Sequence, residues 1–218
     1  MTALRKPAEY TDEAAEQRIV LYGVDWDSYE KLLEGLQRHP GTRLTYNEGT
    51  LEIMVVSFGH EKLSRLICRL ICMICEEWGK DYVDGGSTTF KLQKKEKGFE
   101  PDGCFYFRSI KKLKNKDRID LTTDPAPDLA VEVDISSPSI SRFPIFARLG
   151  VQEVWRWHEG RLDIYQLRGS TYVRRETSRF LKGVKVDAIT GLLDSYRDLS
   201  APAWQRQVID YARRITGK

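Results

Sequence analysis

The chain has 218 residues, of which 41% are hydrophobic and 31% charged, and its formal net charge is +3. These values are ordinary for a globular protein, so they argue against a disordered or repetitive chain, and the length suits one domain with appended elements. Residues 1–20 mix acids and bases without an apolar core, and no apolar run approaches the roughly 18 residues that span a bilayer. We therefore expect a cytoplasmic protein without a membrane segment.

The first part of the chain predicts a helix, a hairpin and a long helix. Residues 27–37 have an amphipathic pattern that ends before a His-Pro-Gly stop. Residues 43–46 and 50–55 alternate around Asn-Glu-Gly, a sequence typical of a β-hairpin turn. Residues 59–78 form the longest helical pattern and are followed by a glycine.

The second part predicts short strands, one intervening helix and a closing helix. Strands are expected at 82–83, 87–93, 98–107, 127–135, 151–157, 161–167 and 171–175, and helices at 140–149 and 202–214. This order favours an α/β (or α+β) domain with a central mixed β-sheet flanked by helices. We expect an N-terminal extension (1–19), a main domain (20–185) and a C-terminal helical extension (186–218).

Two carboxylates occupy positions where the burial of a polar side chain costs free energy. Asp102 precedes the apolar run Gly-Cys-Phe-Tyr-Phe, and Glu132 lies inside Leu-Ala-Val-Glu-Val, a strand that reads as buried on both faces. A buried carboxylate needs a partner, a proton or a metal ion. If the two strands are neighbours, Asp102 and Glu132 can converge on a hard divalent cation, which binds oxygen ligands. The hypothesis requires that their oxygens meet and that neither is neutralised by a permanent salt partner.

Residues 91–118 contain ten basic and four acidic side chains, so this stretch is strongly positive. Because it brackets Asp102, it would suit the approach of a phosphate backbone, which indicates a nucleic-acid partner. The alternative is that a lysine-rich hairpin tip and a solvated loop are charged for solubility.

An ordered series of short motifs resembles a known family. The motifs are Tyr46-x-Glu48-Gly49-x-Leu51-Glu52, Phe58-Gly59-His60-Glu61, Phe99-Glu100-Pro101-Asp102, Pro127-Asp128-Leu129-x-Val131-Glu132-Val133, Ser137-Pro138-Ser139 and Gly150-Val151-x-Glu153-Val154-Trp155. Over roughly residues 20–180 the chain looks like the Uma-two-type putative restriction endonucleases of the PD-(D/E)xK nuclease superfamily.

That resemblance implies a restriction-endonuclease-like core and a Mg²⁺-dependent (or Mn²⁺-dependent) DNA endonuclease. Asp102 would match the aspartate of the PD element, and Glu132 the second acid. By analogy with restriction-type nucleases, a homodimer is expected through the strands at 151–175 or the C-terminal helix.

The chain departs from the superfamily signature at its basic residue. Asp134 stands two positions after Glu132, where a lysine is expected. By resemblance, the basic residue is shifted to Arg142 in the following helix, and Lys91 is a second candidate on the strand expected beside Asp102. Arginine stays protonated, so it could stabilise phosphate charge but not act as a general base. This departure keeps open a second function, a nucleic-acid-binding or assembly module with weak or no cleavage.

Four nearby side chains have alternative interpretations. Glu61 is an additional metal ligand or a residue that offsets the helix dipole, with the two about even. His60 could position a water or phosphate, but a histidine packed at a helix start is commoner. Glu52 is expected on a solvated strand face. Asp134 is expected to share a face with Glu132, because residues i and i+2 of a strand point the same way.

Overall fold

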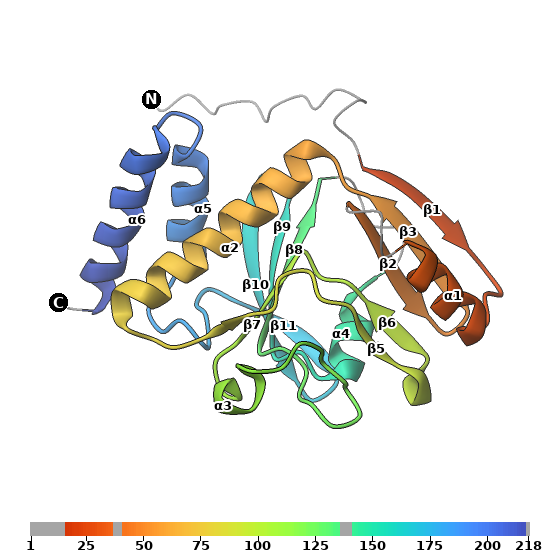
Figure 1. Ribbon diagram of the computed structural model, residues 1–218. Helices are drawn as coiled ribbons and strands as arrows, with labels where there is room; N and C mark the ends of the chain where they lie inside the picture. Colours follow the sequence, from red (N-terminus) through yellow and green to blue (C-terminus); the bar gives the residue numbers. More distant parts are fainter. Residues whose placement is uncertain (1–15, 37–40, 136–140, 217–218) are drawn as a thin grey trace.

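The computed structural model describes residues 16–36, 41–135 and 141–216, which form two β-sheets and several helices (Figure 1). Sheet A has the order β1-β3-β2-β6-β5 and is antiparallel throughout. Its strands are β1 (Gln17–Leu21), β2 (Thr42–Asn47), β3 (Thr50–Val55), β5 (Phe90–Leu92) and β6 (Lys97–Phe99). Sheet A is additional to the central mixed sheet that the sequence predicted.

Sheet B has the order β11-β10-β9-β8-β7-β4, and its mixed character comes from the parallel pair β8–β9. Its strands are β4 (Val83–Asp84), β7 (Gly103–Tyr106), β8 (Leu129–Asp134), β9 (Glu153–His158), β10 (Arg161–Arg168) and β11 (Thr171–Arg175). The expected neighbours around Asp102 and Glu132 are confirmed, because β7 pairs with β8 in antiparallel register.

Helices lie on both sides of sheet B, and α1 packs against sheet A (Figure 1). They are α1 (Trp26–Leu36), α2 (Phe58–Trp78), α3 (Ile110–Leu113), α4 (Phe143–Leu149), α5 (Val186–Ser195) and α6 (Ala201–Thr216). α2, α5 and α6 cover one face, whereas α4 lies on the other side, toward sheet A. The helix expected at 140–149 starts at Phe143, and residues 136–140, including the expected Ser-Pro-Ser start, lie outside the described residues.

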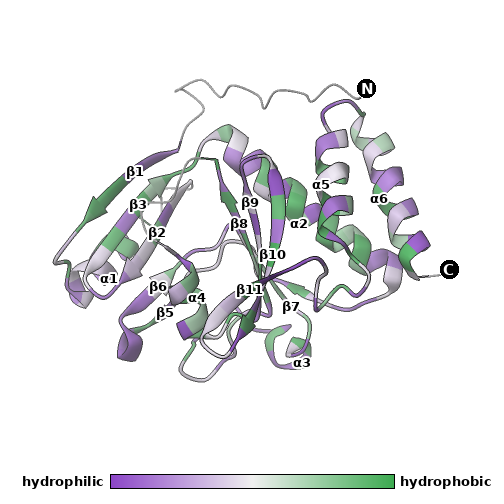
Figure 2. Ribbon diagram, turned by 180° about the vertical axis from the view of Figure 1, so that it is seen from behind, coloured by the Kyte–Doolittle hydropathy of each residue, from purple (hydrophilic) through white to green (hydrophobic). Residues whose placement is uncertain are grey.

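α2 forms because its apolar side chains fall on one stripe and both ends are capped. The Ser57 side chain accepts a hydrogen bond from the backbone N of His60 (3.2 Å), and Gly79 ends the helix at φ 62°. α5 and α6 also carry hydrophilic and hydrophobic residues along their length (Figure 2). The apolar side chains of all three helices join β8 to β10 in the largest core cluster.

A close approach of α2 to sheet B holds Asp102 in place. Asp102 directly precedes Gly103, and a Cβ atom at Gly103 would clash with Sγ of Cys68 on α2. Only a residue without a side chain lets the helix lie this near to β7. The glycine therefore sets the distance between α2 and the strand that follows Asp102.

The first strand and the last helix that the structure describes are integrated into the domain. β1 begins at Gln17 and pairs with β3, so it crosses the expected boundary at residues 19 and 20. α6 packs against α2 through its buried face, and β9 and β10 lie inside sheet B, whereas β11 is an edge strand with mostly exposed residues. Among the described helices, none is both long and apolar enough to cross a membrane.

Candidate active site

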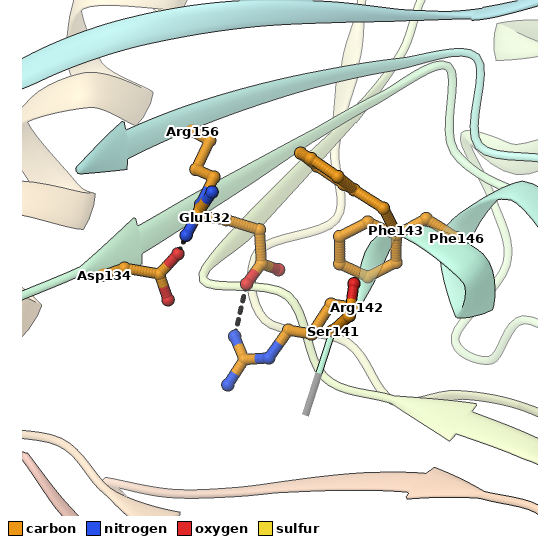
Figure 3. A pocket seen from close by; sticks show the side chains of 7 residues that line it. All are labelled: Glu132, Asp134, Ser141, Arg142, Phe143, Phe146 and Arg156. Atoms are coloured by element: carbon orange, nitrogen blue, oxygen red, sulfur yellow. Dashed lines mark hydrogen bonds and ion pairs between the residues drawn. The ribbon is translucent and has the colours of Figure 1, made fainter. Parts of the chain in front are cut away.

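Charged side chains from both sheets meet where sheet A faces β8. A pocket of about 160 Å³ opens there, lined by Glu132 and Asp134 of β8, Arg156 of β9, and Ser141, Arg142, Phe143 and Phe146 at the start of α4. Figure 3 shows Glu132 and Asp134 leaving β8 on the same side, with Arg142 opposite Glu132 and Arg156 beside Asp134. Asp134 thus shares the face of Glu132, as the strand periodicity predicted.

Glu132 is almost completely buried and has one oxygen without a donor. Its Oε2 accepts a hydrogen bond from Nη1 of Arg142, but Oε1 has no hydrogen-bond partner among the described residues. Burial, helped by the nearby Asp102 and Asp134 carboxylates, outweighs the effect of Arg142 and raises the pKa of Glu132 to about 8. A buried acceptor in this state is costly unless a proton or a ligand satisfies it.

Asp102 lies between β6 and β7 and binds directly to the Glu132 strand. Its Oδ2 accepts a hydrogen bond from the backbone N of Val133 (2.8 Å), and its own N donates to the carbonyl of Val131 (3.1 Å). These two bonds flank Glu132 on β8. Asp102 is thus hydrogen-bonded to the backbone on both sides of Glu132.

His60, at the start of α2, is fully buried between two carboxylates. Its Nε2 lies 2.8 Å from Oδ1 of Asp102, and its Nδ1 lies 2.5 Å from Oε1 of Glu16. Burial lowers the pKa of His60, but the hydrogen bonds to Asp102 and Glu16 outweigh it and raise the pKa to about 9. The ring is therefore protonated at neutral pH and donates to both acids, which makes it an orienting group for Asp102.

Two arginines connect sheet A to the site. Arg142 donates to Glu52 on β3 (3.2 Å) as well as to Glu132. Arg18 on β1 donates to Glu16 (2.6 Å) and Glu52 (3.0 Å), and its guanidinium lies 3.8 Å from Asp134. Glu52 is fully buried, so the expectation of a solvated strand face is wrong. Sheet A packs over that face and brings the carboxylate to the arginines.

The site holds more acids than bases in the part of the chain that the structure describes. Arg156 completes it by donating to Asp134 (2.6 Å). Five carboxylates thus face four basic side chains, which are Glu16, Glu52, Asp102, Glu132 and Asp134 against Arg18, His60, Arg142 and Arg156.

Two predicted site residues do not reach the carboxylate pair. Lys91 forms an exposed ion pair with Glu30 (2.5 Å), because the β5–β6 register places it opposite Gly98, away from Asp102. Glu61 accepts a hydrogen bond from Arg65 (2.8 Å), one turn further along α2. Among the described residues, neither has a recorded contact with Asp102 or Glu132, so the expected positions of Lys91 beside Asp102 and of Glu61 as a ligand are not seen.

The basic side chains of residues 91–118 have no recorded contact with Asp102 or Glu132 among the described residues. Their ion pairs are with local acids, namely Lys97 with Glu48, Arg108 with Asp128, and Lys112 and Lys116 with Asp124. In Figure 1, α3 and the β5–β6 hairpin lie at the opposite end of β8 from Asp134. The expected convergence of this stretch on Asp102 is therefore a correction, and its pairing with local acids fits the alternative of a solvated loop.

Glu16, Arg18 and the position of His60 are features that the sequence did not reveal. His60 falls on the same helical stripe as Ile67, Ile71 and Ile74, and this periodicity could have indicated a buried histidine. No local signal connects Glu16 or Arg18 to α2 or β8, because their contacts join segments far apart in sequence.

Comparisons with known proteins identify the family. Residues 26–196 match the family model Uma2, described as putative restriction endonuclease. The chain belongs to the Uma2 family. A crystal structure of a putative nuclease belonging to DUF820 from Anabaena variabilis ATCC 29413 is similar to it, at 14% identity and a TM-score of 0.51, covering 75% of this chain and 97% of the other. At this identity the likeness shows the fold, and the expected restriction-endonuclease-like core is confirmed. No curated protein matches the chain.

In this Uma2 protein, the carboxylate oxygens of Glu132 and Asp102 suit a divalent cation. The orphaned Oε1 of Glu132 and the excess of acids suit a cation near Glu132, and Asp102 adds a second oxygen donor nearby. However, each predicted ligand already has a basic partner, His60 for Asp102 and Arg142 for Glu132, contrary to the stated requirement. In the described ranges, no group of three or more His, Cys, Asp or Glu side chains is arranged to hold a metal ion. The case for a divalent cation therefore depends on the carboxylates of Glu132 and Asp102.

Proposed function

We propose that this protein is a Mg²⁺-dependent (or Mn²⁺-dependent) DNA endonuclease that hydrolyses phosphodiester bonds at Asp102 and Glu132. The family match supports a nuclease. The observation that carries the proposal is the buried Oε1 of Glu132, which has no hydrogen-bond partner among the residues that the structure describes. Such an atom in a rigid strand is a site prepared for a cation.

The surrounding residues have separate roles in this proposal. A bound divalent ion would supply charge for the phosphoryl oxygens and lower the pKa of a bound water. His60 and the backbone N of Val133 hold the two oxygens of Asp102, so this ligand is fixed before substrate arrives. Arg142 reaches Glu132 from the start of α4, where its guanidinium can also donate to a phosphate oxygen. It remains protonated and takes no proton from water.

A second function is favoured by the same contacts. Because Arg142 occupies Oε2 of Glu132 and His60 occupies Asp102, each acid has a basic partner that a bound cation would have to share or displace. A nucleic-acid-binding or assembly module on a nuclease scaffold, with weak or no cleavage, would keep these pairs intact. The two functions differ in whether the carboxylates are needed for phosphodiester hydrolysis.

Nicking of supercoiled plasmid DNA separates the two functions. The assay compares wild type, Asp102→Ala and Glu132→Gln in Mg²⁺, in Mn²⁺ and in a chelator, with thermal unfolding as a check of the fold. The endonuclease proposal expects nicking by wild type in metal and loss of nicking in both variants. Equal behaviour of wild type and Asp102→Ala would exclude it and support the binding module.

A matched control comes from the first turn of α2. Glu61→Gln removes a carboxylate one residue from His60, but Glu61 contacts Arg65 rather than the acids of the site. We expect this variant to nick DNA at the wild-type rate. A loss as large as that in Glu132→Gln would show that Glu61 belongs to the catalytic group after all.

A further inference from the structure

A second groove lies on the other side of the β8–β9 pair, between the first half of α2 and the end of α5. Its volume is about 370 Å³, and its lining includes Lys62 of α2, Trp157 of β9, and Tyr196 and Arg197 just after α5. Figure 1 shows the N-terminal end of α2 and the end of α5 at the same end of sheet B as the tip of β8. Nothing in the proposed chemistry uses this groove.

The floor of the groove is apolar and rigid. Leu66, Trp157 and Leu193 line it and are 8%, 5% and 3% exposed, so their side chains are fixed in the core beneath. Nζ of Lys62 lies 5.8 Å from the centre of the Tyr196 ring. A flat apolar floor with an aromatic wall suits a sugar or a base, since bases stack on aromatic rings.

The cations at the rim are available to a ligand. Lys62 and Arg197 are exposed, and in the described part of the chain neither forms an ion pair with a carboxylate. Arg18, Arg142 and Arg156 in the active site are, by contrast, all held by acids. Asp194 is the acid among the residues that line the groove, so the rim carries an excess of positive charge. This charge is complementary to phosphate.

Two elements connect the groove to the active site, although the two cavities lie on opposite faces of the β8–β9 pair. Gly59 lines the groove and precedes His60, which binds Asp102. Trp157 lines the groove, follows Arg156 of the active-site pocket, and pairs in register with Val133, whose N binds Asp102. A chain-like ligand that occupies both sites would therefore pass around the ends of β8 and β9.

From these observations we infer that the groove binds the DNA backbone next to the bond that is cut. Lys62 and Arg197 contact phosphates that flank the scissile one, and Trp157 and Tyr196 contact the adjoining sugar or base. The inference rests on the proposed function for its substrate. It assigns strand positioning to the α2–α5 groove in place of the basic stretch at residues 91–118.

Direct binding tests this assignment independently of cleavage. The probe is a fluorescein-labelled DNA duplex of 20 base pairs, and its anisotropy is measured without divalent ions over a range of salt concentrations. The double variant Lys62→Gln/Arg197→Gln is compared with Lys111→Gln/Lys112→Gln, which removes the same charge from the basic stretch. All four side chains are exposed, so both variants are expected to fold.

We expect the groove variant to bind the duplex at least about 10-fold more weakly than wild type. The slope of log K against log salt concentration should become less steep by about 2, since each lost phosphate contact lowers its magnitude by about 1. The control variant is expected to bind within about 2-fold of wild type, as charges far from the strand contribute little. Equal weakening in both variants, a loss only in the control, or no binding by wild type would overturn the inference.

The plasmid assay keeps this inference distinct from the proposed function. Binding that depends on the groove, without any nicking by wild type, would refute the endonuclease and leave the groove assignment standing. Nicking and binding that are both unchanged in Lys62→Gln/Arg197→Gln would refute the groove and leave the endonuclease standing.

Discussion

Glu132 and Glu153 are buried glutamates on adjacent parallel strands of sheet B, yet their surroundings differ completely. Oε1 of Glu153 accepts hydrogen bonds from Nε1 of Trp155 (2.8 Å) and Oγ of Ser178 (2.6 Å). Its Oε2 accepts from the backbone N of Arg179 (2.6 Å) and Nε2 of Gln166 (3.2 Å). Glu132 has a single recorded donor, Arg142, and one oxygen without a partner among the described residues.

The comparison shows that burial of a carboxylate does not by itself indicate a functional site. Burial raises the pKa of both glutamates. At Glu153, neutral donors complete the hydrogen bonding of both oxygens, so the side chain ties β9 to the loop after β11 and has no capacity for a ligand. At Glu132, a charged partner and an orphaned oxygen leave an incomplete arrangement, which a ligand can complete.

Replacement of Glu153 is expected to have the largest effect on stability. Glu153→Ala would leave four donors without their acceptor, and an unsatisfied buried donor costs about 1–3 kcal/mol, so a loss of about 4 kcal/mol in unfolding free energy is expected. Urea denaturation measures it. Glu30→Ala, which removes an exposed partner of Lys91, is the control and should cost less than about 1 kcal/mol. A loss below about 1 kcal/mol in Glu153→Ala would remove the distinction between the two glutamates.

Replacement of Arg142 tests the charged partner of Glu132, which distinguishes it from Glu153. Arg142→Leu would leave Glu132 and Glu52 buried without this common partner, and breaking a buried ion pair costs about 3–5 kcal/mol. Because Glu52 keeps Arg18, we expect the lower end, about 3 kcal/mol, in the same denaturation experiment. Adding Glu132→Gln to Arg142→Leu should recover part of that loss. No recovery in the double variant would show that the two side chains are not coupled.

Glu132→Gln alone is expected to change stability by less than about 1 kcal/mol, because the amide oxygen can still accept from Arg142 and one excess negative charge disappears. Nicking should nevertheless be lost, which separates function from folding at this position. A destabilisation as large as that of Glu153→Ala would instead make Glu132 a structural residue.

The smallest effect concerns pH. The pKa of Glu153 is raised in the folded protein, so the folded state binds this proton more tightly than the unfolded chain does. The contribution of Glu153 to stability is therefore greatest below the ordinary pKa of glutamate and decreases as the pH rises through the folded pKa. Glu153→Gln should show a weaker decrease of unfolding free energy than wild type above about pH 4.5. Parallel curves would contradict this assignment.

The sequence predicted those parts of the fold that depend on local periodicity. The hairpin of β2 and β3, the helix α2 and the strands around Asp102 and Glu132 follow from alternation, helical stripes and turn residues. The condition that the strands of Asp102 and Glu132 are neighbours is met by β7, which directly follows Asp102, and β8. The presence of a carboxylate, Glu132, in an apolar strand was the signal that indicated the candidate site, because a charged residue there needs a compensating group.

The remainder of the site depends on how the two sheets face each other. Glu52 alternates with apolar residues exactly as a half-exposed strand would, and only the packing of sheet A over α4 and β8 buries it. Arg18 and Glu16 precede the motifs of the family and contact residues far along the chain. Lys91 was misplaced for the converse reason, since the short β5–β6 pair turns its side chain to the surface.

One consequence follows from the position of β1. The match to the Uma2 family begins at residue 26, but Glu16 and Arg18 lie upstream of it, on the outermost strand of sheet A. A protein trimmed to the family boundary would keep His60 and Asp102 and discard the counterions that complete their network. Protease cleavage just ahead of Gln17 would therefore remove Glu16 and disturb the hydrogen bonds of the buried His60 from the edge of sheet A.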